Sequence, residues 1–154
     1  MREVNVAVAA PGHTSEDAYR IVADYKRYPD VAESVLGVEI EDLGDGRERC
    51  TWEVKFRRGI LRWTEEGVHD EAEHRIDFAL VEGDLDEMKG HWLIEDAPGG
   101  GSVIRFWSRF DMGIPTLEHL IEPVAADTLR ANVVDILHGL FGSVEELAEA
   151  GADR

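Results

Sequence analysis

The feature that most constrains this chain is a hydrophobic alternation with a period of two residues, which runs from Gly37 to Met112. Such alternation is typical of strands that bury one face. Turn-forming segments interrupt it, among them Gly44-Asp45-Gly46 and Pro98-Gly99-Gly100-Gly101, and such segments favour hairpins. The pattern predicts six antiparallel strands in hairpin succession, over residues 37–43, 47–57, 60–70, 74–82, 86–95 and 102–112.

The two ends of the chain have different periods. Residues 3–9 alternate and predict a further strand, followed by a short helix whose apolar residues are Ala18, Ile21, Val22 and Tyr25. Tyr28-Pro29-Asp30 interrupts that helix, and one more helical turn is expected before Val35. A long helix near 120–148 is predicted from apolar residues at helical spacing: Leu129, Val133, Ile136, Leu137, Leu140, Val144 and Leu147.

This order of elements predicts an α+β fold with a seven-stranded curved antiparallel sheet wrapped around the long C-terminal helix, and one or two short helices after the first strand. One helix laid on a curved sheet covers its apolar face but leaves space between the two. We therefore expect an internal cavity of roughly several hundred Å³, the usual size of a small-ligand site. The length of 154 residues predicts one domain over 1–150 and a short tail over 151–154.

Charge and composition exclude several classes of function. The chain has 33 acidic and 16 basic residues, a net charge of −17, which repels phosphate backbones and argues against a nucleic-acid partner. The single cysteine, Cys50, excludes an internal disulfide and a cysteine-based zinc site, and the histidines lack metal-ligand spacing. No apolar run is long enough for a membrane span and no secretion signal is evident, so we expect a cytoplasmic protein.

The hairpin expected at Arg58-Gly59 predicts which residues share the inner face of two central strands. It would place Val54 opposite Trp63 and Trp52 opposite Glu65. The predicted inner face is apolar apart from Glu65 and His69, and it consists of Cys50, Trp52, Val54, Phe56, Leu61, Trp63, Glu65, Gly67 and His69.

The later strands extend that face. Their inward residues are predicted to be Ile76, Phe78, Leu80, Met88, Gly90, Trp92, Ile94, Ile104, Phe106, Ser108, Phe110 and Met112. Gly67 and Gly90 lack side chains where a closed core would need bulk, so we expect empty space beside them. The cavity mouth is expected near residues 28–35 and 114–117, which lack strong periodicity.

Each polar candidate also has a purely structural explanation. Glu65 could pair with His69 on the same strand or with Arg130 on the long helix. Cys50 is more often a small buried hydrophobe than a nucleophile, and Ser108 lacks a histidine and an aspartate placed to form a triad. The large aromatic residues could simply form the core.

Three segments carry a family resemblance: Ala23-Asp24-Tyr25 through Tyr28-Pro29, Arg62-Trp63-Thr64-Glu65-Glu66, and Glu82-Gly83-Asp84-Leu85 through Gly90-His91-Trp92. With these segments the chain resembles the START-like helix-grip (SRPBCC) superfamily over nearly its whole length. That superfamily includes polyketide cyclases and aromatases, coenzyme Q-binding proteins and plant pathogenesis-related ligand binders. The resemblance implies the helix-grip fold but leaves the activity open, because the superfamily hosts many functions.

Single-domain aromatic polyketide cyclases look most similar in layout, and the resemblance to them implies an aldol cyclisation and dehydration without a cofactor. Trp63 matches a pocket tryptophan of those enzymes, but Gly67 stands at the position of their arginine and Ser34 at that of their tyrosine. The polar chemistry would therefore fall to Glu65 as base or acid and to His69 as donor or proton shuttle.

The expected ligand contacts are Trp52, Trp63, Gly67, Phe78, Met88, Gly90, Trp92, Phe106, Ser108, Arg130, Val133 and Leu137. The implied partner is a hydrophobic small molecule or a polyketide bound to an acyl carrier, and a homodimer stays open. The alternative function is a non-catalytic carrier of a quinone, a lipid or a finished polyketide.

Overall fold

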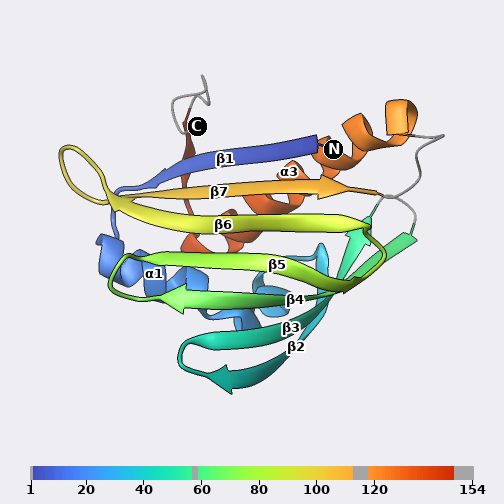
Figure 1. The fold of residues 1–154 in the computed structure, drawn as a ribbon. Helices are drawn as coiled ribbons and strands as arrows, with labels where there is room; N and C mark the ends of the chain where they lie inside the picture. The colour runs from blue at the N-terminus through green and yellow to red at the C-terminus, as the bar shows by residue number, and fades with distance from the viewer. Residues whose placement is uncertain (1, 57–58, 113–117, 148–154) are drawn as a thin grey trace.

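The computed structural model describes residues 2–56, 59–112 and 118–147, with side chains described from residue 124 onward in the last of these ranges. Its strands and helices follow one another with short connections, as Figure 1 shows. In chain order they are β1 (Arg2–Ala10), α1 (Ser15–Ala23), the 3₁₀ helix η1 (Tyr25–Arg27), α2 (Tyr28–Val31), β2 (Val35–Gly44), β3 (Arg47–Phe56), β4 (Gly59–Asp70), β5 (Arg75–Gly83), β6 (Glu87–Asp96), β7 (Ser102–Asp111), α3 (Glu118–Phe141) and β8 (Glu145–Glu146).

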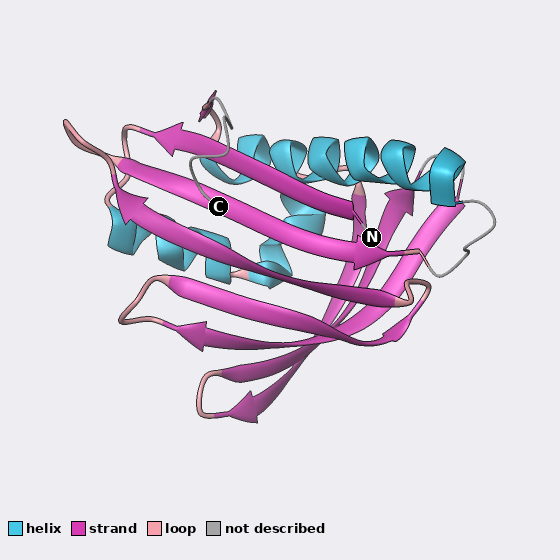
Figure 2. Ribbon diagram, turned by 45° about the horizontal axis from the view of Figure 1, so that its top comes forward, coloured by secondary structure: helices cyan, strands magenta, loops and turns pink. Residues whose placement is uncertain are grey.

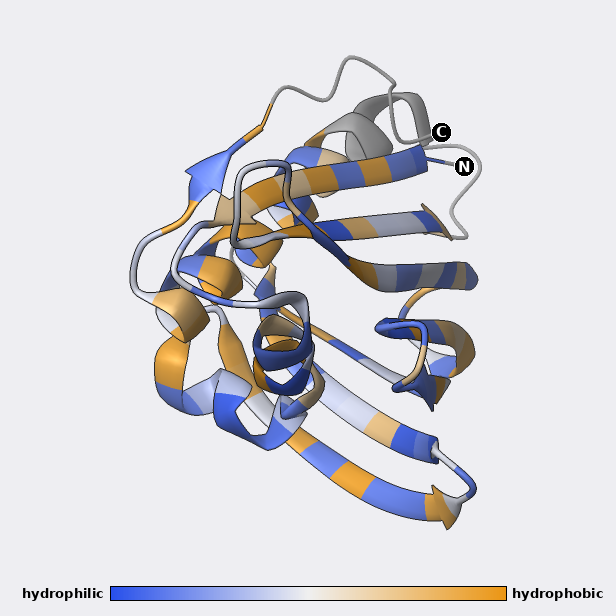
Figure 3. Cartoon of the chain, turned by 90° about the vertical axis from the view of Figure 1, so that its left-hand side faces the viewer, coloured by the Kyte–Doolittle hydropathy of each residue, from blue (hydrophilic) through white to orange (hydrophobic). Residues whose placement is uncertain are grey.

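The strands form one curved antiparallel sheet in the order β2-β3-β4-β5-β6-β7-β1-β8. The helix α3 lies along one side of this sheet, and the short helices α1 and α2 lie on the same side, across other strands (Figure 2). Apolar and polar residues alternate along most strands, which gives the sheet one apolar face (Figure 3). The predicted α+β helix-grip fold is confirmed.

The sheet has eight strands where the sequence predicted seven, because the C-terminal helix ends earlier than expected. Gly142 has φ of 78°, a left-handed conformation that glycine adopts without strain, and its N–H donates to the His138 carbonyl at 2.8 Å. The chain then turns to form β8, and the Leu147 N–H donates to the Ala7 carbonyl at 2.8 Å. Val144 and Leu147, predicted on the helical stripe, therefore follow α3 in extended backbone.

The start of α1 follows the sequence prediction. Thr14 precedes the helix, and its hydroxyl accepts a hydrogen bond from the Asp17 N–H at 3.1 Å. Tyr28 begins α2, with Pro29 in its first turn, where a missing N–H costs nothing. The Tyr28 hydroxyl donates to the Val22 carbonyl at 2.6 Å and holds α2 against the end of α1.

The pairing of β3 with β4 is displaced by two residues from the predicted register. Phe56 faces Gly59, Trp52 faces Trp63 and Cys50 faces Glu65. Two residues are one full strand period, so the predicted inner face is unchanged although its cross-strand partners are different. Of the turn expected at Arg58-Gly59, residue 58 lies outside the described residues.

Gly67 and Gly90 do not border empty space, which corrects the prediction made for them. A Cβ at Gly90 would lie 2.3 Å from the Trp107 carbonyl oxygen and 2.7 Å from Phe78 Cζ. At Gly67 it would lie 3.2 Å from the Asp77 carbonyl oxygen. Both positions are close-packed, because backbone of a neighbouring strand lies over each of them and the Phe78 ring also lies over Gly90.

We expect Gly90→Ala to lower the free energy of unfolding by about 2 kcal/mol or more, since the added methyl group meets backbone that cannot move aside easily. The matched control is Gly37→Ala, where a Cβ would meet nothing within 4 Å. Urea unfolding followed by tryptophan fluorescence measures both. Equal unfolding midpoints for the two variants would contradict the close packing at Gly90.

Candidate functional site

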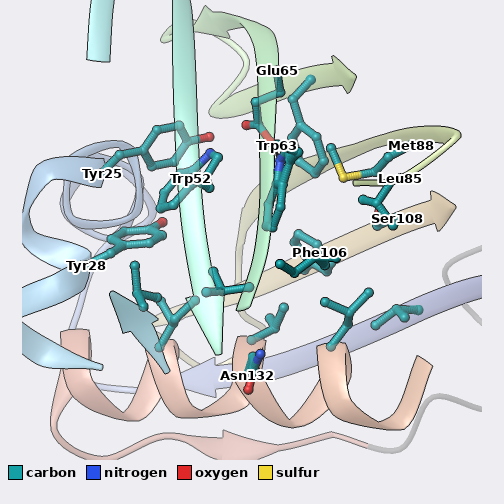
Figure 4. Close-up of a pocket in the computed structure, with 18 of the residues that line it drawn as sticks. Tyr25, Tyr28, Trp52, Trp63, Glu65, Leu85, Met88, Phe106, Ser108 and Asn132 are labelled. Carbon is teal, nitrogen blue, oxygen red and sulfur yellow. Dashed lines mark hydrogen bonds between the residues drawn. The ribbon is translucent and has the colours of Figure 1, made fainter. Parts of the chain in front are cut away.

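A cavity lies between the apolar face of the sheet and the helices. Its volume is about 100 Å³, smaller than the several hundred Å³ that we expected, because aromatic side chains occupy much of the space. Figure 4 shows these side chains converging from β3, β4, the short helices and α3. The lining residues are Val4, Tyr25, Tyr28, Val35, Trp52, Val54, Leu61, Trp63, Glu65, Phe78, Leu85, Met88, Trp92, Phe106, Ser108, Leu129, Asn132, Val133 and Ile136.

Four aromatic rings form one end of the cavity. Trp52 and Trp63 are opposite each other on β3 and β4, and their rings stack with centroids 6.4 Å apart. Tyr25 and Tyr28 come from the short helices and contact Trp52 with centroid distances of 5.2 and 5.5 Å. Together these rings make an apolar wall whose polar atoms lie at the ring edges.

Phe78, Trp92 and Phe106 form a second aromatic group on β5, β6 and β7. Phe106 lies between the other two, with its centroid 5.9 Å from that of Phe78 and 4.8 Å from that of Trp92. Gly90 allows the Phe78 ring to lie against the β6 backbone. The glycine predicted as a ligand contact thus supports a lining residue instead.

Glu65 is a carboxyl group in the lining of this apolar site. Only 5% of its surface is exposed, and its Oε1 accepts a hydrogen bond from Trp63 Nε1 at 2.9 Å. Burial raises the pKa of Glu65 to about 7, opposed in part by the hydrogen bond from Trp63 and by the Trp52 indole, while the nearby Glu48 adds to the increase. This carboxyl group can therefore exchange a proton near neutral pH.

Tyr25 and Tyr28 both line the cavity, although the sequence pattern predicts only a core position for Tyr25 and a place near the mouth for Tyr28. Both side chains are buried. Burial raises the pKa of each hydroxyl well above its usual value, so both remain protonated donors. Their spacing of three residues on a helical segment, with polar tips on large rings, was the signal available in the sequence.

His69 does not line the cavity, although it was predicted to share the chemistry with Glu65. Its ring lies behind Tyr25, at a centroid distance of 5.6 Å. Nε2 of His69 is 2.8 Å from Glu48 Oε1, but the contact lies outside the direction of a good hydrogen bond. Neither predicted partner pairs with Glu65. His69 lies beside Tyr25 and Glu48, and Arg130 pairs with Glu146 at 3.2 Å.

The structure brings most of the predicted ligand contacts to the cavity. Those that line it are Trp52, Trp63, Phe78, Met88, Trp92, Phe106, Ser108 and Val133. Outside its lining are Gly67, Gly90, Arg130 and Leu137, of which Leu137 is fully buried in the core. Tyr28 and Val35, expected near the mouth, do line the cavity, whereas residues 114–117 lie outside the described residues.

The remaining polar groups have local partners. Ser108 donates to the Lys89 carbonyl at 3.2 Å, and Asn132, another lining residue that was missed, donates to the Lys55 carbonyl at 3.2 Å. Burial raises the pKa of Cys50 to about 12, so its thiol stays protonated and behaves as a small hydrophobe.

Within the described ranges, no three His, Cys, Asp or Glu side chains gather in a way that could hold a metal ion. None of the described helices combines the length and hydrophobicity needed to cross a membrane.

The burial of Glu65 makes stability depend on pH. Because its pKa is raised from 4.5 to about 7 in the fold, its contribution to stability is present at low pH and is lost as the pH rises through about 7. We expect Glu65→Gln, which stays neutral, to gain about 3 kcal/mol over the wild type between about pH 4 and about pH 8.

Urea unfolding across that range measures the effect. Glu66→Gln is the control from the opposite face of β4, where hydrogen bonding to Arg49 lowers the pKa of Glu66. Its stability difference from the wild type should not change between about pH 6 and about pH 8. If the free energy of unfolding of Glu65→Gln changes with pH in the same way as that of the wild type, Glu65 is ionised in the folded protein and the prediction is wrong.

Solved structures of similar fold come from several organisms. The protein TTHA0849 of Thermus thermophilus has a TM-score of 0.83 and 25% sequence identity, over 92% of this chain and 95% of that one. The Zhui aromatase/cyclase of Streptomyces sp. R1128 has a TM-score of 0.77 and 19% identity, over 92% of each chain. A START superfamily protein of Mycobacterium smegmatis has a TM-score of 0.74 and 20% identity, over 92% of this chain and 96% of that one.

A search of curated protein sequences found no match. The sequence profile described as "polyketide cyclase / dehydrase and lipid transport" matches residues 11–136, which include most of the sheet and most of α3. The matched segment covers more than half of the chain and contains Glu65 and the aromatic lining described above. The chain belongs to the polyketide cyclase / dehydrase and lipid transport family.

Proposed function

We propose that this protein binds a hydrophobic, carbonyl-bearing molecule in its cavity and promotes aldol cyclisation and dehydration of a polyketide-type chain, with Glu65 as the acid–base group. The observation that carries the proposal is Glu65 itself. Among the described residues it is the one carboxyl group that lines the cavity, and its pKa of about 7 suits proton transfer near neutral pH.

The proposed chemistry needs one group that takes a proton and returns it. The Glu65 carboxylate removes a proton from a carbon between two carbonyl groups, and the resulting enolate carbon bonds to a distant ketone carbon of the same chain. Glu65 then gives its proton to the new alkoxide. In the dehydration, Glu65 removes the second proton of that carbon, a double bond forms, and the hydroxyl group leaves with the proton as water.

The aromatic lining supplies the second requirement, which is restriction of a flexible chain. Trp52, Trp63 and Phe106 line the same cavity as Glu65 with large aromatic rings (Figure 4). Holding the two reacting carbons close together removes conformational freedom that a free chain would lose only in the transition state. A polyketide is larger than 100 Å³, so binding requires the half-buried Trp63 and Met88 side chains to move.

His69 has a positioning role in this proposal. Its ring contacts Tyr25 and its Nε2 lies beside Glu48, so it supports the wall of the cavity from behind. A proton donor for the substrate carbonyl must therefore come from another residue. The substrate would arrive free or attached to an acyl carrier.

A specific observation favours the carrier function as a second candidate. The acid–base groups among the described lining residues are Glu65 and two tyrosines, and burial keeps both tyrosines protonated. With one titratable group, the cavity can hold a quinone, a lipid or a finished polyketide without changing it. The description of the family includes lipid transport as well as cyclisation.

Incubation with a reconstituted minimal polyketide synthase, followed by chromatography and mass spectrometry of the products, separates the two candidates. We expect the wild type to change the product profile and Glu65→Gln to reduce that change about 100-fold or more, the usual effect of losing an acid–base group. Glu66→Gln should behave as the wild type. Products that are unaffected by the wild-type protein would favour the carrier.

A further inference from the structure

Two hydrogen-bond donors at one end of the cavity have no well-aligned acceptor among the described residues. They are the Tyr25 hydroxyl and the Trp52 Nε1, and both are buried. Only 4% of Tyr25 and 6% of Trp52 is exposed to solvent. Leaving a buried donor unpaired costs free energy, so a native protein normally satisfies such groups with protein, water or ligand.

The neighbouring rings show that this is not a general property of the wall. The Tyr28 hydroxyl donates to the Val22 carbonyl at 2.6 Å, and Trp63 Nε1 donates to Glu65 at 2.9 Å. Each of these two donors has a nearby equivalent without a partner: Tyr25 beside Tyr28, and Trp52 stacked on Trp63.

The two unpaired donors lie close together and face the same space. The rings of Tyr25 and Trp52 meet edge to face at a centroid distance of 5.2 Å. In Figure 4 the Tyr25 hydroxyl, the Trp52 indole nitrogen and the Glu65 carboxyl group point toward one another. The Trp52 indole favours the ionised form of Glu65 as a hydrogen-bond donor, although its contact with Glu65 does not reach the geometry of a full hydrogen bond.

The chemistry of the donors restricts what can occupy that space. An indole N–H only donates, and a buried tyrosine hydroxyl with no acceptor is free to donate. The matching group is an acceptor with two lone pairs and no hydrogen of its own. A carbonyl oxygen meets this description, whereas a ligand carboxylate would lie beside Glu65 and repel its ionised form.

We propose that Tyr25 and Trp52 form a two-donor site for a ligand carbonyl oxygen beside Glu65, which makes a planar ketone the preferred ligand class. The inference rests on the proposed function and adds the recognition of the substrate oxygen. Two donors on the oxygen draw electron density from the carbonyl group and make the neighbouring C–H more acidic, so the site would also assist proton removal by Glu65.

Acetophenone and ethylbenzene test the site, because they share a phenyl ring with a two-carbon side chain and only acetophenone has the oxygen. We expect Tyr25→Phe to weaken acetophenone binding about 10-fold, the value of one hydrogen bond, and to leave ethylbenzene binding within about 2-fold. When the wild type binds acetophenone labelled with ¹³C at the carbonyl carbon, the carbonyl resonance of the ligand should move downfield. Binding to Tyr25→Phe should move it less.

Tyr28→Phe is the matched control, because the Tyr28 hydroxyl already has a partner. It should lower stability and keep the wild-type ratio of acetophenone to ethylbenzene affinity. Tyr25→Phe should keep or raise stability, since the hydroxyl that it removes is unpaired. Trp52→Phe, which removes the second donor, should lower the same affinity ratio as Tyr25→Phe.

The outcomes separate this inference from the proposed function. If the wild type binds both probes and Tyr25→Phe changes their affinities by the same factor, or changes neither, the two-donor site is wrong while the hydrophobic cavity stands. If the wild type binds neither probe, the cavity is not a ligand site, and both proposals fail.

Discussion

One long helix must cover the apolar face of an eight-stranded sheet, and the other features of this protein depend on that constraint. A helix is too narrow to fill the hollow of a strongly curved sheet. Large aromatic side chains from β3 to β7, together with two tyrosines from the short helices, fill most of the remainder. What they leave is a cavity of about 100 Å³ whose shape is set by rings rather than by backbone.

The apolar surroundings of Glu65 determine the pKa of its carboxyl group. The cross-strand pairing sets Cys50 opposite it, and Trp63 donates a hydrogen bond to its carboxyl group at 2.9 Å. The loss of water around the carboxyl group raises its pKa to about 7, so the group changes charge near neutral pH. The same burial that makes Glu65 costly for stability makes it useful for proton transfer.

Family membership and fold do not determine the chemistry, which depends on the individual side chains that line the cavity. The START-like fold hosts many functions, so the difference between a cyclase and a carrier must lie in the groups at the cavity wall. In this chain those groups are a carboxyl with a shifted pKa and two donors that lack acceptors. Both features favour a ligand that carries a carbonyl oxygen over a plain hydrocarbon.

The sequence alone determined the faces of the strands, because side-chain direction follows from a local period of two residues. That period placed Trp52, Trp63 and Glu65 together on the inner face, and a register error of two residues left this result unchanged. Only the tertiary structure decided which side chains meet. The packing of the sheet brings Trp107 backbone and Phe78 over Gly90, the His69 ring lies beside Tyr25 and Glu48 rather than in the cavity, and packing of the short helices brings Tyr25 to the cavity. These contacts join residues far apart in the chain and depend on sheet twist and helix placement, which no local pattern encodes.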